Sequence, residues 1–301
     1  MQQRNQWIDI AKGIGILLVV IGHSSIPIFM SNFIWAFHMP LFFICSGWVT
    51  SWGKYSVGEF VANKVRTLLI PFIIYSSIVL LVKEIIGIGD LYLWLRKGWQ
   101  GYALWFVPVL FFASIIVRII NAAGKQYVLL GGILCLILGA FLSYFKISLP
   151  WTISSIPYAV FLIILGSVLN KYAKFIATPK WYILVCCAII TFTISSLWRL
   201  DMAFNNILPV IPLTCGAISG TFMIFFTSSY IYNNTKILSN ILQAIGRETF
   251  IILAFSQIIS MTLIECTSLG VIARYVIDFS LLIALKYLKD FVNHLVGRKL
   301  L

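Results

Sequence analysis

Apolar segments long enough to cross a bilayer recur from one end of this 301-residue chain to the other. Hydrophobic residues make up 61% of the sequence and charged residues only 10%, a composition typical of proteins with several membrane spans. Inside lipid, every backbone N–H and C=O must be satisfied within the protein, and apolar stretches of about 20 residues do this as helices. The sequence therefore predicts an all-α, polytopic membrane protein whose residues 1–301 form a single domain.

About ten transmembrane helices are expected, with both termini in the cytoplasm. The predicted spans lie near residues 7–26, 33–50, 67–86, 104–122, 127–145, 153–169, 182–198, 207–232, 246–265 and 269–288. If the N-terminus is cytoplasmic, most of the 22 Lys and Arg residues fall on the cytoplasmic side, where positive charge accumulates in membrane proteins. The net charge of +13 thus indicates orientation, and no nucleic-acid partner is expected. The ten tryptophans fit a role as anchors at the membrane surfaces.

The first predicted span carries two ionisable side chains on one face. Lys12 and His23 are eleven residues apart, a spacing that returns to within about 20° around a helix and covers roughly 16 Å along it. An ionisable group at membrane depth costs about 2.5 kcal/mol or more, so it marks a functional position by default. A neutral histidine is suited to take a proton from a hydroxyl, which makes His23 a candidate general base.

His38 and Ser46 are the candidate partners of His23 on the second span. Only a short link separates the first two spans, so His38 can reach a depth similar to that of His23. Ser46 places a hydroxyl further along the same span. For either histidine, the alternative role is a hydrogen bond between helices.

A basic cluster is predicted at the cytoplasmic mouth, formed by Lys12 together with Lys64 and Arg66 at the start of the third span. Guanidinium and ammonium groups gathered in this way suit a phosphorylated ligand. The alternative for Lys12 is to extend toward the headgroups and pair with Asp9, one turn away.

Gly15 and Gly22 lie beside the line that joins Lys12 to His23. Without side chains, these positions leave either a narrow slot for an extended ligand or a surface for close helix packing. Both uses stay open from the sequence.

No metal site is expected. The six cysteines lie in or at the edge of apolar spans without the spacing of metal ligands, and they are interpreted as small packing residues. Arg274 and Asp278, four residues apart in the last predicted span, are interpreted as a structural ion pair.

Several short motifs carry a family resemblance. They are residues 8–15 continuing to 21–23, 37–48, 64–66 before Pro71, 104–106 and 245–255. Through them the chain resembles, over its whole length, the acyltransferase-3 family of integral-membrane O-acyltransferases, and most closely its fucose 4-O-acetylase-like branch. The most specific motif is a basic residue, ten intervening positions and a histidine; the family usually has arginine where this chain has Lys12. The late motif commonly ends in histidine, where this chain has Ser256 and Gln257.

This resemblance implies an enzyme that moves an acyl group, usually acetyl, from cytoplasmic acetyl-CoA to a sugar hydroxyl. The acceptor would be a surface polysaccharide or its lipid-linked precursor, and the location the bacterial inner membrane. The implied partners are acyl-CoA, a sugar or glycan acceptor and the lipid bilayer, with no metal.

On this hypothesis, the CoA phosphates bind Lys12, Lys64 and Arg66, and the pantetheine arm passes the two glycines named above. An arm of roughly 15–20 Å would match the separation of Lys12 from His23. His23 then acts as general base on the acceptor hydroxyl, with His38 or Ser46 orienting the reactants.

Two rival functions remain open at this point. A transporter or flippase for a lipid-linked glycan would use Lys12, His23 and the Arg274–Asp278 pair along a pathway. A glycan polymerase is also polytopic, but a large outer loop with several arginines would be expected for it, and this chain has none.

Overall fold

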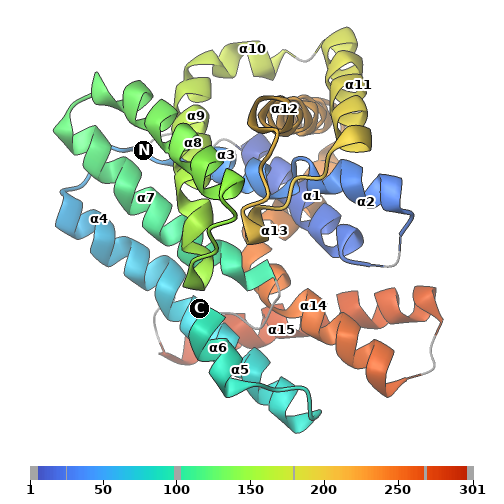
Figure 1. Ribbon diagram of the computed structural model, residues 1–301. Coiled ribbons are helices and arrows are strands. Elements are labelled where there is room, and N and C mark those ends of the chain that lie inside the picture. Colours follow the sequence, from blue (N-terminus) through green and yellow to red (C-terminus); the bar gives the residue numbers. More distant parts are fainter. Residues whose placement is uncertain (1–5, 25, 98–102, 179, 268–269, 297–301) are drawn as a thin grey trace.

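The computed structural model describes residues 6–24, 26–97, 103–178, 180–267 and 270–296, and within these the chain is a bundle of helices (Figure 1). No strand forms in the described residues; an isolated bridge joins Asp201 to Asn206. The predicted fold class, an all-α polytopic membrane protein, is confirmed.

The helices follow one another along the chain with short connections. They are α1 (Gln6–Gly22), α2 (Ile28–Trp35), α3 (His38–Val49), α4 (Val57–Lys64), the π-helical turn η1 (Val65–Leu69), α5 (Ile70–Ile85), α6 (Leu91–Lys97), η2 (Ala103–Trp105), α7 (Phe106–Ala123), α8 (Tyr127–Tyr144), η3 (Pro150–Ser155), α9 (Ile156–Leu169), η4 (Asn170–Tyr172), α10 (Ala173–Ala177), α11 (Trp181–Leu197), η5 (Met202–Phe204), α12 (Val210–Asn234), α13 (Lys236–Arg247), α14 (Thr249–Cys266) and α15 (Val271–Val296).

Each of the ten predicted spans coincides with a helix, but fewer helices are long and apolar enough to cross a bilayer unaided. In the described part of the chain, six candidate spans meet that condition: Ile28–Val49, Val57–Ile85, Ala103–Ala123, Tyr127–Tyr144, Pro150–Ile176 and Val210–Asn234. A seventh results if α13 and α14, bent by 78° at their junction, form one span. The number ten and the cytoplasmic position of both termini stay predictions.

The first helix is shorter than the sequence predicts. With 17 residues, α1 is about 25 Å long, less than the roughly 30 Å of the hydrocarbon core. It ends at Gly22, four residues before the predicted end, although the His23 N–H still donates to the Val19 carbonyl at 3.2 Å. His23 therefore lies at the end of the helix and not within it.

Local sequence signals explain several helix starts. Ser56 caps α4 in a capping box, because its hydroxyl accepts from the Glu59 N–H while the Glu59 carboxylate accepts from the Ser56 N–H at 2.9 Å. Pro157 stands in the first turn of α9, a position that proline favours, and Pro71 is the second residue of α5, which begins directly after the π-helical turn η1.

Glycines allow the central helices to approach closely. A Cβ atom added to Gly47 would lie closer than 3.0 Å to the backbone oxygen of Ile163, and one added to Gly166 equally close to that of Ile44. The backbones of α3 and α9 are therefore in direct contact where they cross, as small residues permit in membrane bundles. A Cβ on Gly246 would collide in the same way with the backbone of α1, against which α13 packs.

The core lies around α1 and α3. Trp7, Trp48 and Phe225 meet edge to face there, with ring centroids 5.2–5.4 Å apart, and join α1 and α3 to α12.

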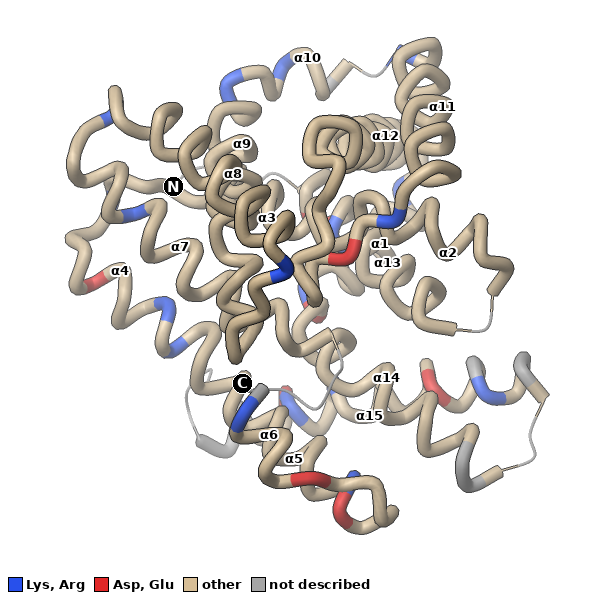
Figure 2. Tube along the Cα trace, in the orientation of Figure 1, with Lys and Arg blue, Asp and Glu red and all other residues tan. Residues whose placement is uncertain are grey.

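At one side of the bundle α14 packs against α5 and α15 (Figure 1). The Lys289 ammonium contacts the Glu248 carboxylate at the α13–α14 bend. Charged residues are sparse along the trace and lie mostly at helix ends and connections (Figure 2).

Candidate functional site

The two histidines named from the sequence lie next to each other. His23 follows α1 and His38 begins α3, and their ring centroids are 6.1 Å apart. Trp35, from the end of α2, stacks on His23 at 5.3 Å and meets His38 edge to face at 5.7 Å. The short helix α2 thus folds the chain back so that the two imidazoles share one site.

Backbone hydrogen bonds fix the orientation of both imidazole rings. Nδ1 of His23 lies 3.0 Å from the Val19 carbonyl oxygen, and Nδ1 of His38 lies 2.9 Å from the Ile34 carbonyl oxygen. A carbonyl oxygen can only accept, so each Nδ1 carries the hydrogen in these bonds. In the neutral rings, Nε2 then holds the lone pair that can accept a proton.

The histidines line a cavity of about 140 Å³. Its other walls are Trp35, Met39, Pro40, Ala103, Trp105, Leu200, Asp201, Met202, Ala203 and Phe204. His38 is 3% exposed, whereas His23 is exposed at the cavity. Ligand pockets in proteins typically hold about 300–1,000 Å³, so this cavity fits a reacting group and not a whole cofactor.

The segment between α11 and α12 closes one side of the site. Arg199 places its guanidinium 3.9 Å from the centroid of the Trp35 ring and donates to the Asn32 amide oxygen at 3.4 Å. Asp201 accepts from the Ala203 N–H at 3.1 Å, which fixes the start of η5. Burial raises the pKa of the Asp201 carboxyl, and hydrogen bonds from the Ala203 and Phe204 backbone lower it by less. This carboxyl therefore holds a proton more readily than an exposed aspartate.

Gln257 supports the cavity from α14. Its amide oxygen accepts a hydrogen bond from the Ala103 N–H at 2.8 Å, and Gln257 is 9% exposed. Ala103 begins η2, whose last residue Trp105 is also in the cavity wall. Gln257, the neighbour of Ser256 at the end of the late motif, thus positions η2.

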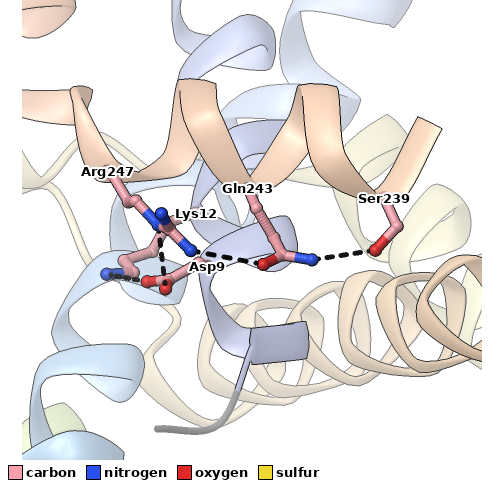
Figure 3. A network of polar contacts seen from close by, with 5 residues as sticks. All are labelled: Asp9, Lys12, Ser239, Gln243 and Arg247. Atoms are coloured by element: carbon pink, nitrogen blue, oxygen red, sulfur yellow. Dashed lines mark hydrogen bonds and ion pairs between the residues drawn. The ribbon is translucent and has the colours of Figure 1, made fainter. Parts of the chain in front are cut away.

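Lys12 belongs to a separate polar network at the other end of α1 (Figure 3). Its ammonium lies 2.9 Å from the Asp9 carboxylate, whose side chain is 4% exposed. Arg247 reaches the same carboxylate at 3.9 Å and donates at 3.4 Å to Gln243, which donates at 2.9 Å to Ser239. Of the two roles considered for Lys12, the ion pair with Asp9 is present.

A further cation, not named from the sequence, lies beside Lys12. The cation that shares Asp9 with Lys12 is Arg247 from α13. Lys64 lies over the Phe60 ring at 5.4 Å, and Arg66 is exposed on η1. A role of Lys64 and Arg66 in phosphate binding stays a prediction.

Gly15 and Gly22 serve helix packing in this structure. A Cβ on Gly15 would lie 2.8 Å from the Leu41 side chain, and one on Gly22 would lie 3.0 Å from the Ile34 side chain. The space beside both glycines is therefore filled by α2 and α3. A ligand could pass here only if these helices moved away from α1.

Ser46 is separated from the histidines. It lies eight residues from His38 along α3, roughly 12 Å along the axis, and is not among the residues of the histidine cavity. The structure thus brings His23 and His38 together and leaves Ser46 outside their site.

Trp35 and Trp105 are site residues that the sequence interpretation missed. The tryptophans were all expected to anchor the protein at the membrane surfaces, but these two line the cavity and Trp48 is 1% exposed in the core. Trp35 lies close to His38 in the chain, and this closeness could have indicated that Trp35 belongs to the histidine site.

A second, apolar cavity of about 110 Å³ lies next to this site along the same helices. It is lined by Ile16, Phe42, Leu68, Phe106, Val107, Leu110, Thr249, Phe250 and Leu253. Phe42 follows Met39 by three residues on α3, and Phe106 follows Trp105 directly, so the two cavities have neighbouring walls.

Comparison with known proteins identifies the family. Neither a curated protein nor a solved structure matches the chain. The sequence model of the acyltransferase-3 family, described as an acyltransferase domain, matches residues 5–286. That match includes both histidines, the Lys12–Asp9 pair and every wall of the cavity between α1, α3 and η5. The chain therefore belongs to the acyltransferase-3 family of integral-membrane proteins.

Proposed function

We propose that this membrane acyltransferase moves an acetyl group from acetyl-CoA to a sugar hydroxyl of a surface polysaccharide or of its lipid-linked precursor. The observation that supports it most is the pair of imidazoles in one cavity, each with Nδ1 bonded to a backbone carbonyl. The proposal includes a bacterial inner membrane as its location and a place in the fucose 4-O-acetylase-like branch of the family.

In the proposed reaction, the acceptor hydroxyl attacks the thioester carbonyl carbon while Nε2 of His23 takes the hydroxyl proton. The C–S bond then breaks, and the proton passes to the departing thiolate, giving an ester and free CoA. A general base of this kind contributes about 10²–10⁴-fold in rate. His38, nearly buried and 6.1 Å from His23 between ring centroids, orients the reactants.

The donor is proposed to enter from the side of Lys12. Its phosphates would bind Lys12, Lys64 and Arg66, with Arg247 as a further cation beside Asp9. We propose that the pantetheine arm passes by the apolar cavity lined by Ile16, Phe42 and Phe106, whose walls neighbour those of the histidine cavity. We favour this route over the slot at Gly15 and Gly22, because side chains fill that slot.

The direct test is incorporation of labelled acetyl from acetyl-CoA into glycan by membranes that contain this protein. We expect an alkali-labile acetyl ester on the glycan and one free thiol per ester formed. Transport of glycan across sealed vesicles without a new ester would refute acyl transfer to the glycan and support the rival transporter or flippase.

Gln257 provides a prediction about the cavity wall. Replacing it with leucine leaves the Ala103 N–H without its acceptor, at a cost of about 1–3 kcal/mol for a buried group. We expect η2 to shift, Trp105 to move in the wall, and kcat to fall roughly 10-fold, which corresponds to about 1.4 kcal/mol. Gln257→Glu, which keeps an oxygen at the same reach, should recover most of the rate. An unchanged kcat in Gln257→Leu would show that this hydrogen bond does not matter for the site.

A further inference from the structure

A larger cavity opens on the other side of η5. It has a volume of about 420 Å³, within the range of small-molecule sites. It is lined by Leu93, Arg96, Ser148, Leu149, Pro150, Trp151, Thr152, Ser154, Ser155, Ala203, Phe204 and Asn205. Ala203 and Phe204 are walls of the histidine cavity as well, so only η5 separates the two spaces.

The walls of this cavity combine aromatic surface with hydrogen-bonding groups. Phe204 is 71% exposed and Trp151 is partly exposed. Thr152, 7% exposed, and Arg96 make no hydrogen bond or ion pair within the described part of the chain, so the hydroxyl and the guanidinium stay available. Flat apolar faces beside oxygen and nitrogen donors match a sugar, whose rings have apolar C–H surfaces and hydroxyl edges.

Other polar residues of the wall already have structural partners. The Ser154 hydroxyl accepts from the Leu149 N–H at 2.9 Å, and the Ser155 hydroxyl donates to the Met202 carbonyl. The first bond closes the turn at the start of η3, and the second joins η3 to η5. The groups left for a ligand are therefore those of Thr152 and Arg96, with Ser148 exposed beside them.

Backbone strain is concentrated at this cavity. Of the four non-glycine residues with positive φ in the described part of the chain, three line it: Trp151 at 58°, Thr152 at 56° and Asn205 at 52°. For a bulky or β-branched residue this conformation is an outlier, and such strain persists mainly at sites where function requires it. Trp151 and Thr152 are adjacent, so the strained turn presents both side chains to the same space.

We infer that this cavity is the acceptor subsite and binds a carbohydrate chain beside the acetylation site. In this subsite, Trp151 and Phe204 pack on sugar faces, and Thr152 and Arg96 donate hydrogen bonds to sugar oxygens. The inference rests on the proposed function, because it assigns the glycan acceptor a place. The sugar unit to be acetylated then extends past Phe204, which lines both cavities, so that its hydroxyl reaches the histidines.

The experiment compares Thr152→Val, which removes the hydroxyl but keeps the branched shape, with Thr152→Ser, which keeps the hydroxyl. Arg96→Met removes the guanidinium while conserving chain length. Phe291→Ala, an exposed aromatic on α15 outside all these cavities, is the matched control. The probe is a set of oligosaccharides cut from the source cells' surface polysaccharide after alkaline removal of ester groups.

Binding of the oligosaccharides to the purified protein and the KM for them in acetyl transfer are measured separately. We expect Thr152→Val and Arg96→Met each to weaken binding and raise this KM about 5- to 10-fold, as for loss of one hydrogen bond. Thr152→Ser and Phe291→Ala should stay within twofold of the wild type.

The outcomes separate the two proposals. Unchanged binding and KM in both variants, with acetyl transfer intact in the wild type, would overturn the acceptor subsite alone. If the wild type binds the oligosaccharides but transfers no acetyl, and both variants bind them more weakly, the subsite would be supported and the proposed function overturned. No binding of the oligosaccharides by the wild type would overturn the subsite as a carbohydrate site.

Discussion

Replacing His23 with alanine should lower the rate of acetyl transfer by about 10²–10⁴-fold. The His23 ring contributes the Nε2 lone pair that we assign to proton removal, and alanine has no group that accepts a proton. Its ring lines a cavity, where it meets the rings of Trp35 and His38, so insertion into the membrane should continue normally. The measurement is the initial rate of label incorporation, divided by the amount of inserted protein.

His294→Ala is the matched control, because this exposed histidine of α15 lies outside the cavity. It should keep wild-type activity. His38→Ala should also lower the rate, and the double variant should be little worse than His23→Ala if the two rings act as one unit. Activity of His23→Ala within a few-fold of wild type would refute its assignment as general base.

Replacing Gly166 with valine should prevent accumulation of folded protein. The added Cβ would meet the backbone oxygen of Ile44, and a backbone atom in a packed helix cannot turn aside as a flexible side chain can. Forced separation of α3 from α9 also moves His38, because this residue begins α3. We expect a loss of about 3 kcal/mol or more, a large part of the total stability of most proteins. Size-exclusion chromatography and thermal unfolding in detergent measure it.

Gly58→Ala is the control for that substitution. Gly58 is also helical, in α4, but a Cβ there would meet nothing within 4 Å. Because alanine favours a helix by about 1 kcal/mol over glycine, this variant should be as stable as wild type or slightly more so. A folded, stable Gly166→Val protein would mean that α3 and α9 do not cross as closely as described.

The helical fold and the histidine pair could be predicted from the sequence because short-range features determine both. Apolar segments in a bilayer have few structures available, and the link from His23 to His38 is too short to carry the rings far apart. The length of α1 was harder to predict: a span of about 20 residues has to run through the polar His23 and Ser24 to Ile26, while the helix ends at Gly22.

Only one of the two ionic partners around Lys12 could be predicted from spacing along the chain. Asp9 was a visible candidate one turn away, but Arg247 joins it only because α13, more than two hundred residues later, packs along α1 through Gly246. The predicted cluster of Lys12 with Lys64 and Arg66 stays a prediction.

The cavity of about 420 Å³ beside η5 could not be predicted from the sequence. Its walls come from α6, from η3 and its preceding turn, and from η5, which lie far apart in the chain. The positive φ angles of Trp151 and Thr152 also leave no trace in composition, because glycine is the residue that usually marks such turns. The sequence interpretation placed every tryptophan at the membrane surfaces, because tryptophan is frequent there. In the structure, Trp35 and Trp105 instead line the histidine cavity.

The connection that runs from Arg199 to Asn205 carries walls of both neighbouring cavities, yet it is not part of any long packed helix. None of the glycines at which the central helices cross lies in this connection, so its exchange leaves those crossings in place. On the proposed function, a chimera that carries a relative's version of these residues should adopt that relative's acceptor while retaining its own donor.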